Sequence, residues 1–140
     1  MVHAPDAPSW RRRLPASLAL GIAIAVKLLP ARRRLRVRFM LARSTRWLPA
    51  AAPQDVRELY AAVVACQPSW WWPGQIDCKE RSLATVLACA LTGRRCHLVW
   101  GARSSPDAYH AWVAAPDGTQ VGDEEAGGAD HPWKPVYISP

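Results

Sequence analysis

The sequence predicts an α+β fold in which helices come first and a small antiparallel sheet follows. Residues 54–66 and a stretch beginning near residue 78 repeat apolar side chains at helical spacing. Residues 95–102 and 108–115 read as strands, and Asp117-Gly118 after them is a strong signal for a tight hairpin. A chain of 140 residues is long enough for one domain with one hydrophobic core.

The basic charge of the chain, whose net value is +7, is concentrated at its N-terminal end. Residues 1–50 contain 11 Lys and Arg and one acid, Asp6, whereas the rest contains 7 basic and 10 acidic residues. Such a segment attracts nucleic acid, acidic lipid or an acidic peptide, or is only a solvated face. The composition therefore divides the chain into a basic, apolar helical region, residues 1–52, and a core, residues 53–140.

The N-terminal region imitates a signal peptide, but its details argue against one. The apolar run Ala16–Val26 is too short to span a bilayer, Lys27 interrupts it, and arginines follow where a small-residue cleavage site would belong. A second basic, apolar stretch runs over residues 35–47. We expect two helices joined near Pro30 that pack on the core or on a partner. The alternative is a peripheral membrane contact through residues 10–48.

The start of the helix near residue 78 is well marked. Asp77 is a good N-cap, Glu80 three residues later completes a capping-box-like pair, and Gly93 is a good C-terminal stop. Cys78 therefore occupies about the first helical position, where unpaired backbone N–H groups and the helix dipole favour an anion. A thiol in this place ionises more readily, so Cys78 is the one cysteine of four that we expect to be reactive.

The predicted hairpin brings a histidine and an acid to one face of the sheet. With Asp117-Gly118 as a two-residue turn, Trp112 faces Asp123 and His110 faces Glu125. Asp123 is then the diagonal neighbour of His110, within reach of a ring nitrogen. A one-residue slip in register would move Asp123 to the opposite face, and Glu125 is the alternative acid.

The order of Cys78, His110 and Asp123 along the chain suggests nucleophilic catalysis. The thiolate would attack a carbonyl, the imidazole would take and return a proton, and the carboxylate would hold the imidazole in the useful tautomer. The backbone N–H at the helix start, with Gln75 as a further candidate, would donate to the developing oxyanion. No cysteine pair has C-x-x-C spacing, so we expect no metal site.

The same motifs lie in the segment CKERSLATVLACALTGRRCHLVWGARSSPDAYHAWVAAPDGTQVGD. This segment resembles the transglutaminase-like cysteine peptidases of lasso-peptide biosynthesis. The matching residues are Cys78, Arg81, Ser82, Leu83, Gly93, Gly101, Arg103, His110, Ala111, Trp112, Val113 and Asp123. The resemblance covers roughly residues 54–125, and the N-terminal helices also look like those that precede the core in this family. Lys79 departs from the Leu that the family usually carries.

The resemblance implies a papain/transglutaminase-like core, with the nucleophile helix packed on a small antiparallel sheet and N-terminal helices before it. It also implies a stand-alone leader peptidase, which cuts a ribosomally made precursor between leader and core and needs no cofactor. A separate ATP-dependent cyclase then joins the freed core amine to an acidic side chain. The expected partners are the precursor, a separate leader-binding protein (the RiPP recognition element) and the cyclase, without nucleic acid. The expected location is the cytoplasm, with membrane association as an option.

Residues around the nucleophile are candidates for substrate contacts. They are Trp70, Trp71, Trp72, Gln75, Arg81 and Trp112. The three consecutive tryptophans are expected to wall the groove for the end of the leader, although one or two of them would serve the core instead. Arg81 alternatively braces the first helical turn, and Trp112 alternatively shields the imidazole or only packs.

Two other functions remain open on the sequence alone. One is a non-catalytic scaffold that binds the precursor or a membrane through the basic helices and the tryptophans. The other keeps the thiol chemistry but passes the thioester to an amine. The tail over residues 126–140 is expected to be an ordered but irregular cover, and His131 within it is assigned no role.

Overall fold

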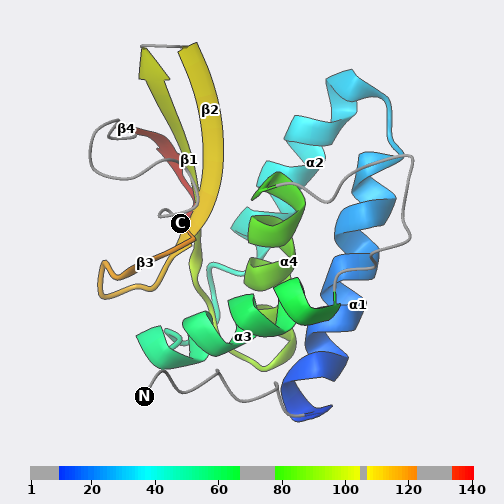
Figure 1. Ribbon diagram of the computed structural model, residues 1–140, viewed down its shortest axis with the longest axis vertical. Coiled ribbons are helices and arrows are strands. Elements are labelled where there is room, and N and C mark those ends of the chain that lie inside the picture. The colour runs from blue at the N-terminus through cyan, green and yellow to red at the C-terminus, as the bar shows by residue number, and fades with distance from the viewer. Residues whose placement is uncertain (1–9, 67–77, 105–106, 123–133) are drawn as a thin grey trace, which may run out of the picture.

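The computed structural model describes residues 10–66, 78–104, 107–122 and 134–140. These residues form the helices α1 (Trp10–Lys27), α2 (Ala31–Ser44), α3 (Pro53–Cys66) and α4 (Cys78–Leu91), and the strands β1 (His97–Ser104), β2 (Asp107–Ala114), β3 (Gln120–Val121) and β4 (Lys134–Ile138). The strands form one antiparallel sheet in the order β3-β2-β1-β4, with the helices gathered on one side of it (Figure 1). The predicted α+β fold is confirmed.

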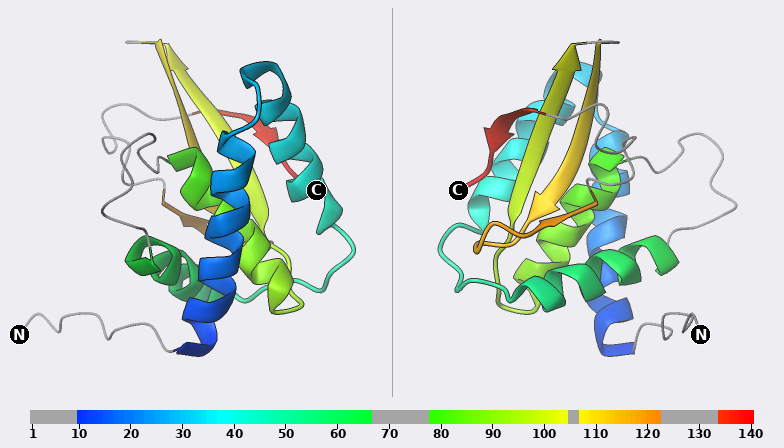
Figure 2. Two further views of the ribbon diagram at one scale, coloured as in Figure 1. Left: turned by 90° about the vertical axis from the view of Figure 1, so that its right-hand side faces the viewer. Right: turned by 60° about the vertical axis from the view of Figure 1, so that its left-hand side comes forward.

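The helices form two layers behind the sheet. Helix α4 packs against β1 and β2, and α1 lies on the far side of α4 (Figures 1 and 2). Helix α3 crosses α4, contacts α1 and reaches β3. One cluster of buried apolar side chains runs through these contacts from α1 to the sheet. Helix α4 is therefore the central element of the fold.

The sequence of α4 explains both its burial and its end. Every residue from Ser82 to Cys89 is buried. Gly93 has a φ of +82°, and its N–H donates to the carbonyl of Ala90 at 2.9 Å. The N–H of Arg94 donates to the carbonyl of Cys89 at 3.0 Å. These bonds satisfy carbonyls that the last turn leaves without helical partners, and so the predicted stop at this glycine is confirmed.

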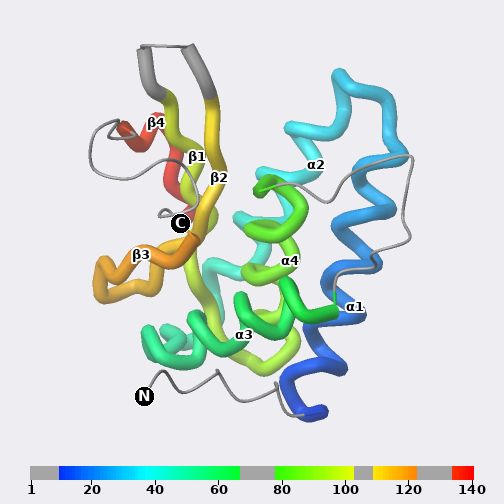
Figure 3. Tube along the Cα trace, in the orientation of Figure 1, coloured from blue at the N-terminus to red at the C-terminus, as the bar shows by residue number. Residues whose placement is uncertain are grey.

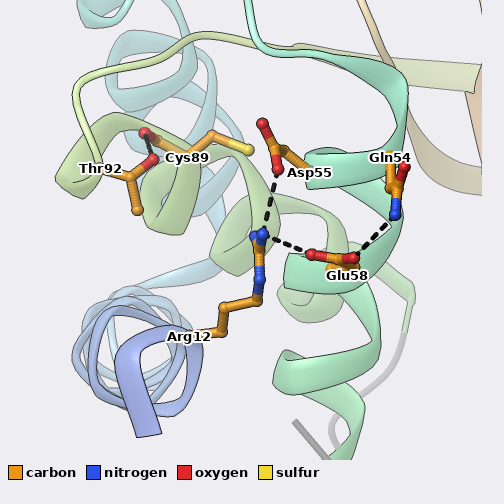
Figure 4. A network of polar contacts seen from close by, with 6 residues as sticks. All are labelled: Arg12, Gln54, Asp55, Glu58, Cys89 and Thr92. Carbon is orange, nitrogen blue, oxygen red and sulfur yellow. Dashed lines mark hydrogen bonds and ion pairs between the residues drawn. The ribbon is translucent and has the colours of Figure 1, made fainter. Parts of the chain in front are cut away.

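Helix α1 turns mainly small side chains toward the core, which allows a close approach to α4. Its buried residues are Ala16, Ala19, Leu20, Ala23 and Val26. Arg12 ties the start of α1 to α3 through Asp55 Oδ1 at 3.0 Å and through Glu58 (Figure 4). Within the described residues, no helix combines the length and the apolarity needed to cross a membrane.

Helices α1 and α2 are joined around Pro30, as predicted, and a short link then leads to α3 (Figure 3). The proposed boundary at residue 52 falls in this link and stays a prediction. The core cluster contains residues from both sides of the boundary, among them Ala42 of α2 and Val56 of α3.

Helix α2 contacts the β4 edge of the sheet through aromatic rings. Phe39 stacks on Tyr137 of β4 with ring centroids 4.0 Å apart and meets Trp100 of β1 edge to face at 6.0 Å. The expectation of an irregular cover over residues 126–140 is therefore wrong where β4 forms. Pro135 lies within this strand, and an edge strand tolerates a proline because one side of it needs no backbone donor.

The β2–β3 hairpin has a register one residue away from the predicted one. Val113 pairs with Val121, so a continued ladder would set Trp112 opposite Gly122 and not opposite Asp123. The predicted pairing is therefore wrong. Strand β3 ends at Val121, and Asp123 itself lies outside the described residues.

Pro116 explains this register. The N–H of Gly118 donates to the carbonyl of Ala115 at 2.9 Å, and the N–H of Ala115 donates to the carbonyl of Thr119 at 2.8 Å. Gly118 has a φ of +97°. A proline sets the φ that suits the second position of a type I turn, and a left-handed glycine then completes a three-residue loop. The N–H of Thr119 also donates to Asp117 Oδ1 at 2.9 Å, which holds the pKa of that carboxyl below its usual value.

Candidate active site

Cys78 is the first residue of α4, and its side chain is half-buried. The prediction that this cysteine opens a helix is confirmed. Ser82 donates its hydroxyl hydrogen to the Cys78 carbonyl at 2.6 Å, which reinforces the first turn. The N–H groups of a first helical turn have no carbonyl partners within the helix, so the thiol lies where the backbone favours an anion.

The same turn carries a buried carboxylate. Glu80 is 1% exposed, and its Oε1 accepts a hydrogen bond from Arg38 Nη2 of α2 at 3.0 Å. The ammonium of Lys27, at the end of α1, lies 3.9 Å from the same oxygen. Both N-terminal helices therefore hold the turn that begins with Cys78. From the sequence we predicted only a capping role for Glu80, because nothing in the local pattern shows a partner 42 residues away.

His110 lies on β2, the strand against which α4 packs, and is 8% exposed. Its Nε2 is 3.1 Å from the carbonyl oxygen of Gly122. A carbonyl oxygen can only accept, so Nε2 carries the hydrogen and donates it. In the neutral ring the lone pair is therefore on Nδ1, which is the atom able to take a proton. The fold thus fixes the tautomer through a backbone group.

Gly122 is a site residue that the sequence analysis missed. It has a φ of +89°, and a Cβ at this position would lie 3.1 Å from the ring of Tyr60 on α3. Both the backbone conformation and the crowding favour glycine here. The Gly122 carbonyl thus helps to orient the imidazole of His110, which is the role predicted for Asp123, the next residue. The only signal in the sequence is the glycine directly before Asp123, which does not identify a carbonyl acceptor.

Trp112 packs beside the imidazole. Its ring stacks on His110 with centroids 5.7 Å apart, and its side chain is almost fully buried. The indole lies over Gly101 of β1, where a Cβ would come within 2.3 Å of the ring. Any other residue at 101 would therefore displace the indole from its present position. The burial of Trp112 beside His110 agrees with the prediction that it shields the imidazole. The predicted contact of Trp112 with substrate stays a prediction.

The remaining predicted site residues are placed only in part. Asp123 and the substrate candidates Trp70, Trp71, Trp72 and Gln75 lie outside the described residues, as does Glu125. Arg81 is half-buried on the first turn of α4. Among the described His, Cys, Asp and Glu residues, no group of three or more is arranged to hold a metal ion.

None of the four cysteines, all of which lie in described residues, forms a disulfide. Cys89 and Cys96 are buried, and a hydrogen bond between their thiols, together with burial, raises the pKa of Cys96. Cys66 is half-buried at the last residue of α3, which is the carbonyl end of a helix. Cys78 alone combines exposure with the N-terminal end of a helix, where the dipole favours an anion.

These positions predict the order of thiol labelling. With limiting iodoacetamide at neutral pH, we expect Cys78 to react first, Cys66 more slowly, and Cys89 and Cys96 only on unfolding, because thiolates are the reacting species. Peptide mapping by mass spectrometry of the folded protein measures all four sites together. Equal labelling of Cys66 and Cys78 would contradict the prediction that the Cys78 thiol is the most reactive of the four.

A hollow of about 380 Å³ lies among α1, α3 and the residues that follow α4. Its lining residues are Arg11, Arg12, Ala51, Asp55, Leu59, Thr92 and Arg94. Neither Cys78 nor His110 lines it, so the candidate active site is identified by its side chains and not by the size of this hollow.

Comparison with known proteins gives one match. A family model described as the transglutaminase-like superfamily matches residues 16–131, a range that starts within α1 and includes all of α2, α3 and α4. No curated protein and no solved structure matches the chain.

Proposed function

Because the chain belongs to the transglutaminase-like superfamily, we propose that it is a cysteine peptidase that removes the leader from a ribosomally made lasso-peptide precursor. The observation that carries the chemistry is the pairing of two elements. A half-buried cysteine opens α4, and the strand packed against α4 carries a histidine whose Nε2–H donates to Gly122, so that Nδ1 is the nitrogen that can accept a proton in the neutral ring. The leader-peptidase assignment is supported by the motif around Cys78 and His110, which resembles that of the lasso-peptide enzymes.

The proposed reaction begins with proton transfer from the Cys78 thiol to His110 Nδ1. The thiolate attacks the scissile carbonyl carbon, and the first-turn N–H of α4 donates to the oxyanion that forms. The C–N bond then breaks as Nδ1–H gives its proton to the leaving amine, which is the new N-terminus of the core peptide. The leader remains attached to the sulfur as a thioester.

Water completes the proposed cycle. His110 Nδ1 takes a proton from the attacking water, the carbon–sulfur bond breaks, and the thiol recovers its proton from the imidazole. The leader leaves with a free carboxylate. Throughout, the hydrogen bond from Nε2 to Gly122 keeps the ring orientation constant and stabilises the imidazolium. Asp123 or Glu125 would add a carboxylate to this support only where the chain leaves the β2–β3 ladder after Val121, because a continued ladder in the observed register would turn both away from His110.

The proposed substrate and partners follow from the same resemblance. The leader would be presented by a separate leader-binding protein, because the helices α1 and α2 are basic, apolar helices that share the core of this chain. A separate cyclase would use the freed amine. The tryptophans at residues 70–72 and Arg81 remain candidates for holding the residues before the cut, and Gln75 for the oxyanion.

The direct test is reconstitution. The purified protein is incubated with the precursor and the leader-binding protein encoded beside it, and the products are measured by intact mass spectrometry. We expect two fragments whose masses add to the precursor plus one water, with a free amine on the core. An intact precursor would overturn the proposal and favour a scaffold, whereas a leader joined to an added amine would show acyl transfer.

A further inference from the structure

Helix α1 carries an apolar face that is turned away from the core. Trp10, Leu14, Leu18 and Ile22 follow one another at four-residue intervals and are 71%, 57%, 56% and 41% exposed. Residues four apart are neighbours on a helix surface. These four side chains therefore form one continuous band, which we call the α1 stripe.

The fold keeps the α1 stripe at the surface. On the opposite side of the helix, Ala19 and Ala23 are buried against the core, and Arg12 is held by two carboxylates of α3 (Figure 4). Rotating α1 to hide the stripe would break both sets of contacts. Exposed apolar side chains that occur singly need no explanation, but a continuous band indicates a binding surface.

Basic side chains accompany the α1 stripe, and no acidic residue lies on the same two helices. Arg11 and Arg13 are exposed near its start, and Arg32, Arg33 and Arg36 are exposed on α2, which directly follows α1. Neither helix contains an Asp or a Glu. A partner that covers this surface would therefore meet large apolar side chains with exposed arginines nearby, which favours a partner with negative charge.

We propose that the α1 stripe docks on an anionic lipid surface. An apolar band with a tryptophan at one end and arginines near both ends is the pattern of a helix that lies in the plane of a bilayer interface. The apolar side chains would enter the acyl boundary while the guanidinium groups meet lipid phosphates. The contact is peripheral, since no described helix is suited to crossing a membrane.

The orientation of the fold is compatible with this contact. The sheet that carries His110 lies on the other side of α4 from α1 (Figures 1 and 2). A protein bound through the α1 stripe would thus turn its sheet away from the bilayer. This inference stands on α1 and α2 alone and does not depend on the proposed peptidase activity.

Vesicle co-sedimentation of the full-length protein tests the proposal. We expect binding to vesicles of mixed phosphatidylcholine and phosphatidylglycerol, little binding to phosphatidylcholine alone, and weaker binding at high salt. The double variant Leu18→Ser/Ile22→Ser should lose at least about ten-fold in partition coefficient, because two apolar side chains no longer enter the lipid. The double variant Arg32→Gln/Arg33→Gln removes two positive charges, and its partition coefficient should fall by on the order of five-fold for each arginine replaced.

A matched control is available on β4. Val136 and Ile138 are 63% and 56% exposed, and Val136→Ser/Ile138→Ser should bind vesicles as the parent protein does. Circular dichroism establishes that each variant is folded. Parent-like binding by the Leu18→Ser/Ile22→Ser variant would overturn the proposal. A second outcome would also overturn it: the parent protein forms a dimer in sedimentation velocity, the Leu18→Ser/Ile22→Ser variant does not, and the parent does not bind vesicles. The stripe would then pack against a second copy of the chain.

Discussion

Replacing Cys78 with alanine is expected to abolish cleavage of the precursor. The proposed nucleophile would be lost while the fold remains, because this side chain is half-buried at the start of α4 and a smaller side chain fits there. Loss of a covalent nucleophile typically lowers the rate constant by on the order of 10⁴-fold or more. The rate of appearance of the core peptide in the reconstituted assay measures the effect.

Two further variants make this result specific. Cys66→Ala changes another half-buried cysteine, at the far end of α3, and should retain full activity. His110→Ala should match the loss in Cys78→Ala, and the double variant should be no worse than either single one, because residues that act as a unit are not additive. Full cleavage by Cys78→Ala would leave the thiol without a role and refute the proposed mechanism.

Replacing Glu80 with alanine is expected to lower the free energy of unfolding by about 3–5 kcal/mol. The variant would leave the guanidinium of Arg38, itself only 7% exposed, in the interior without its carboxylate. Removing one member of a buried pair costs much more than the pair contributes by itself. Urea unfolding followed by circular dichroism measures the loss, and activity should fall with it because Glu80 lies on the turn that begins with Cys78.

Two controls test whether the loss of stability in Glu80→Ala comes from leaving a buried charge without its partner. The side chain of Glu58 is 40% exposed and forms an ion pair with Arg12. Glu58→Ala removes this exposed pair and should lower the free energy of unfolding by less than about 1 kcal/mol. The double variant Glu80→Met/Arg38→Met should recover much of the stability lost in Glu80→Ala, because no charge of that pair is left behind. Equal losses in Glu80→Ala and Glu58→Ala would contradict the role given to the buried pair.

The regular elements were predictable because their signals are local. Apolar spacing indicated α3 and α4, and Gly93 marked the end of α4 because it adopts a backbone conformation that other residues avoid. The hairpin was predicted at the right place but with the wrong register. The register depends on Pro116, because a proline before Asp117-Gly118 favours a three-residue loop over the two-residue turn.

The sequence by itself determined where the two candidate catalytic side chains lie in the secondary structure. It singled out Cys78 by its place at a helix start and His110 by its place on a strand, because both depend on neighbours within a few residues. Only the tertiary structure decided how they are supported. The Gly122 carbonyl at His110, the Arg38 guanidinium at Glu80 and the outward direction of the α1 stripe all depend on segments distant in sequence. Hydrogen bonds and burial between such segments follow from packing, which no local pattern encodes.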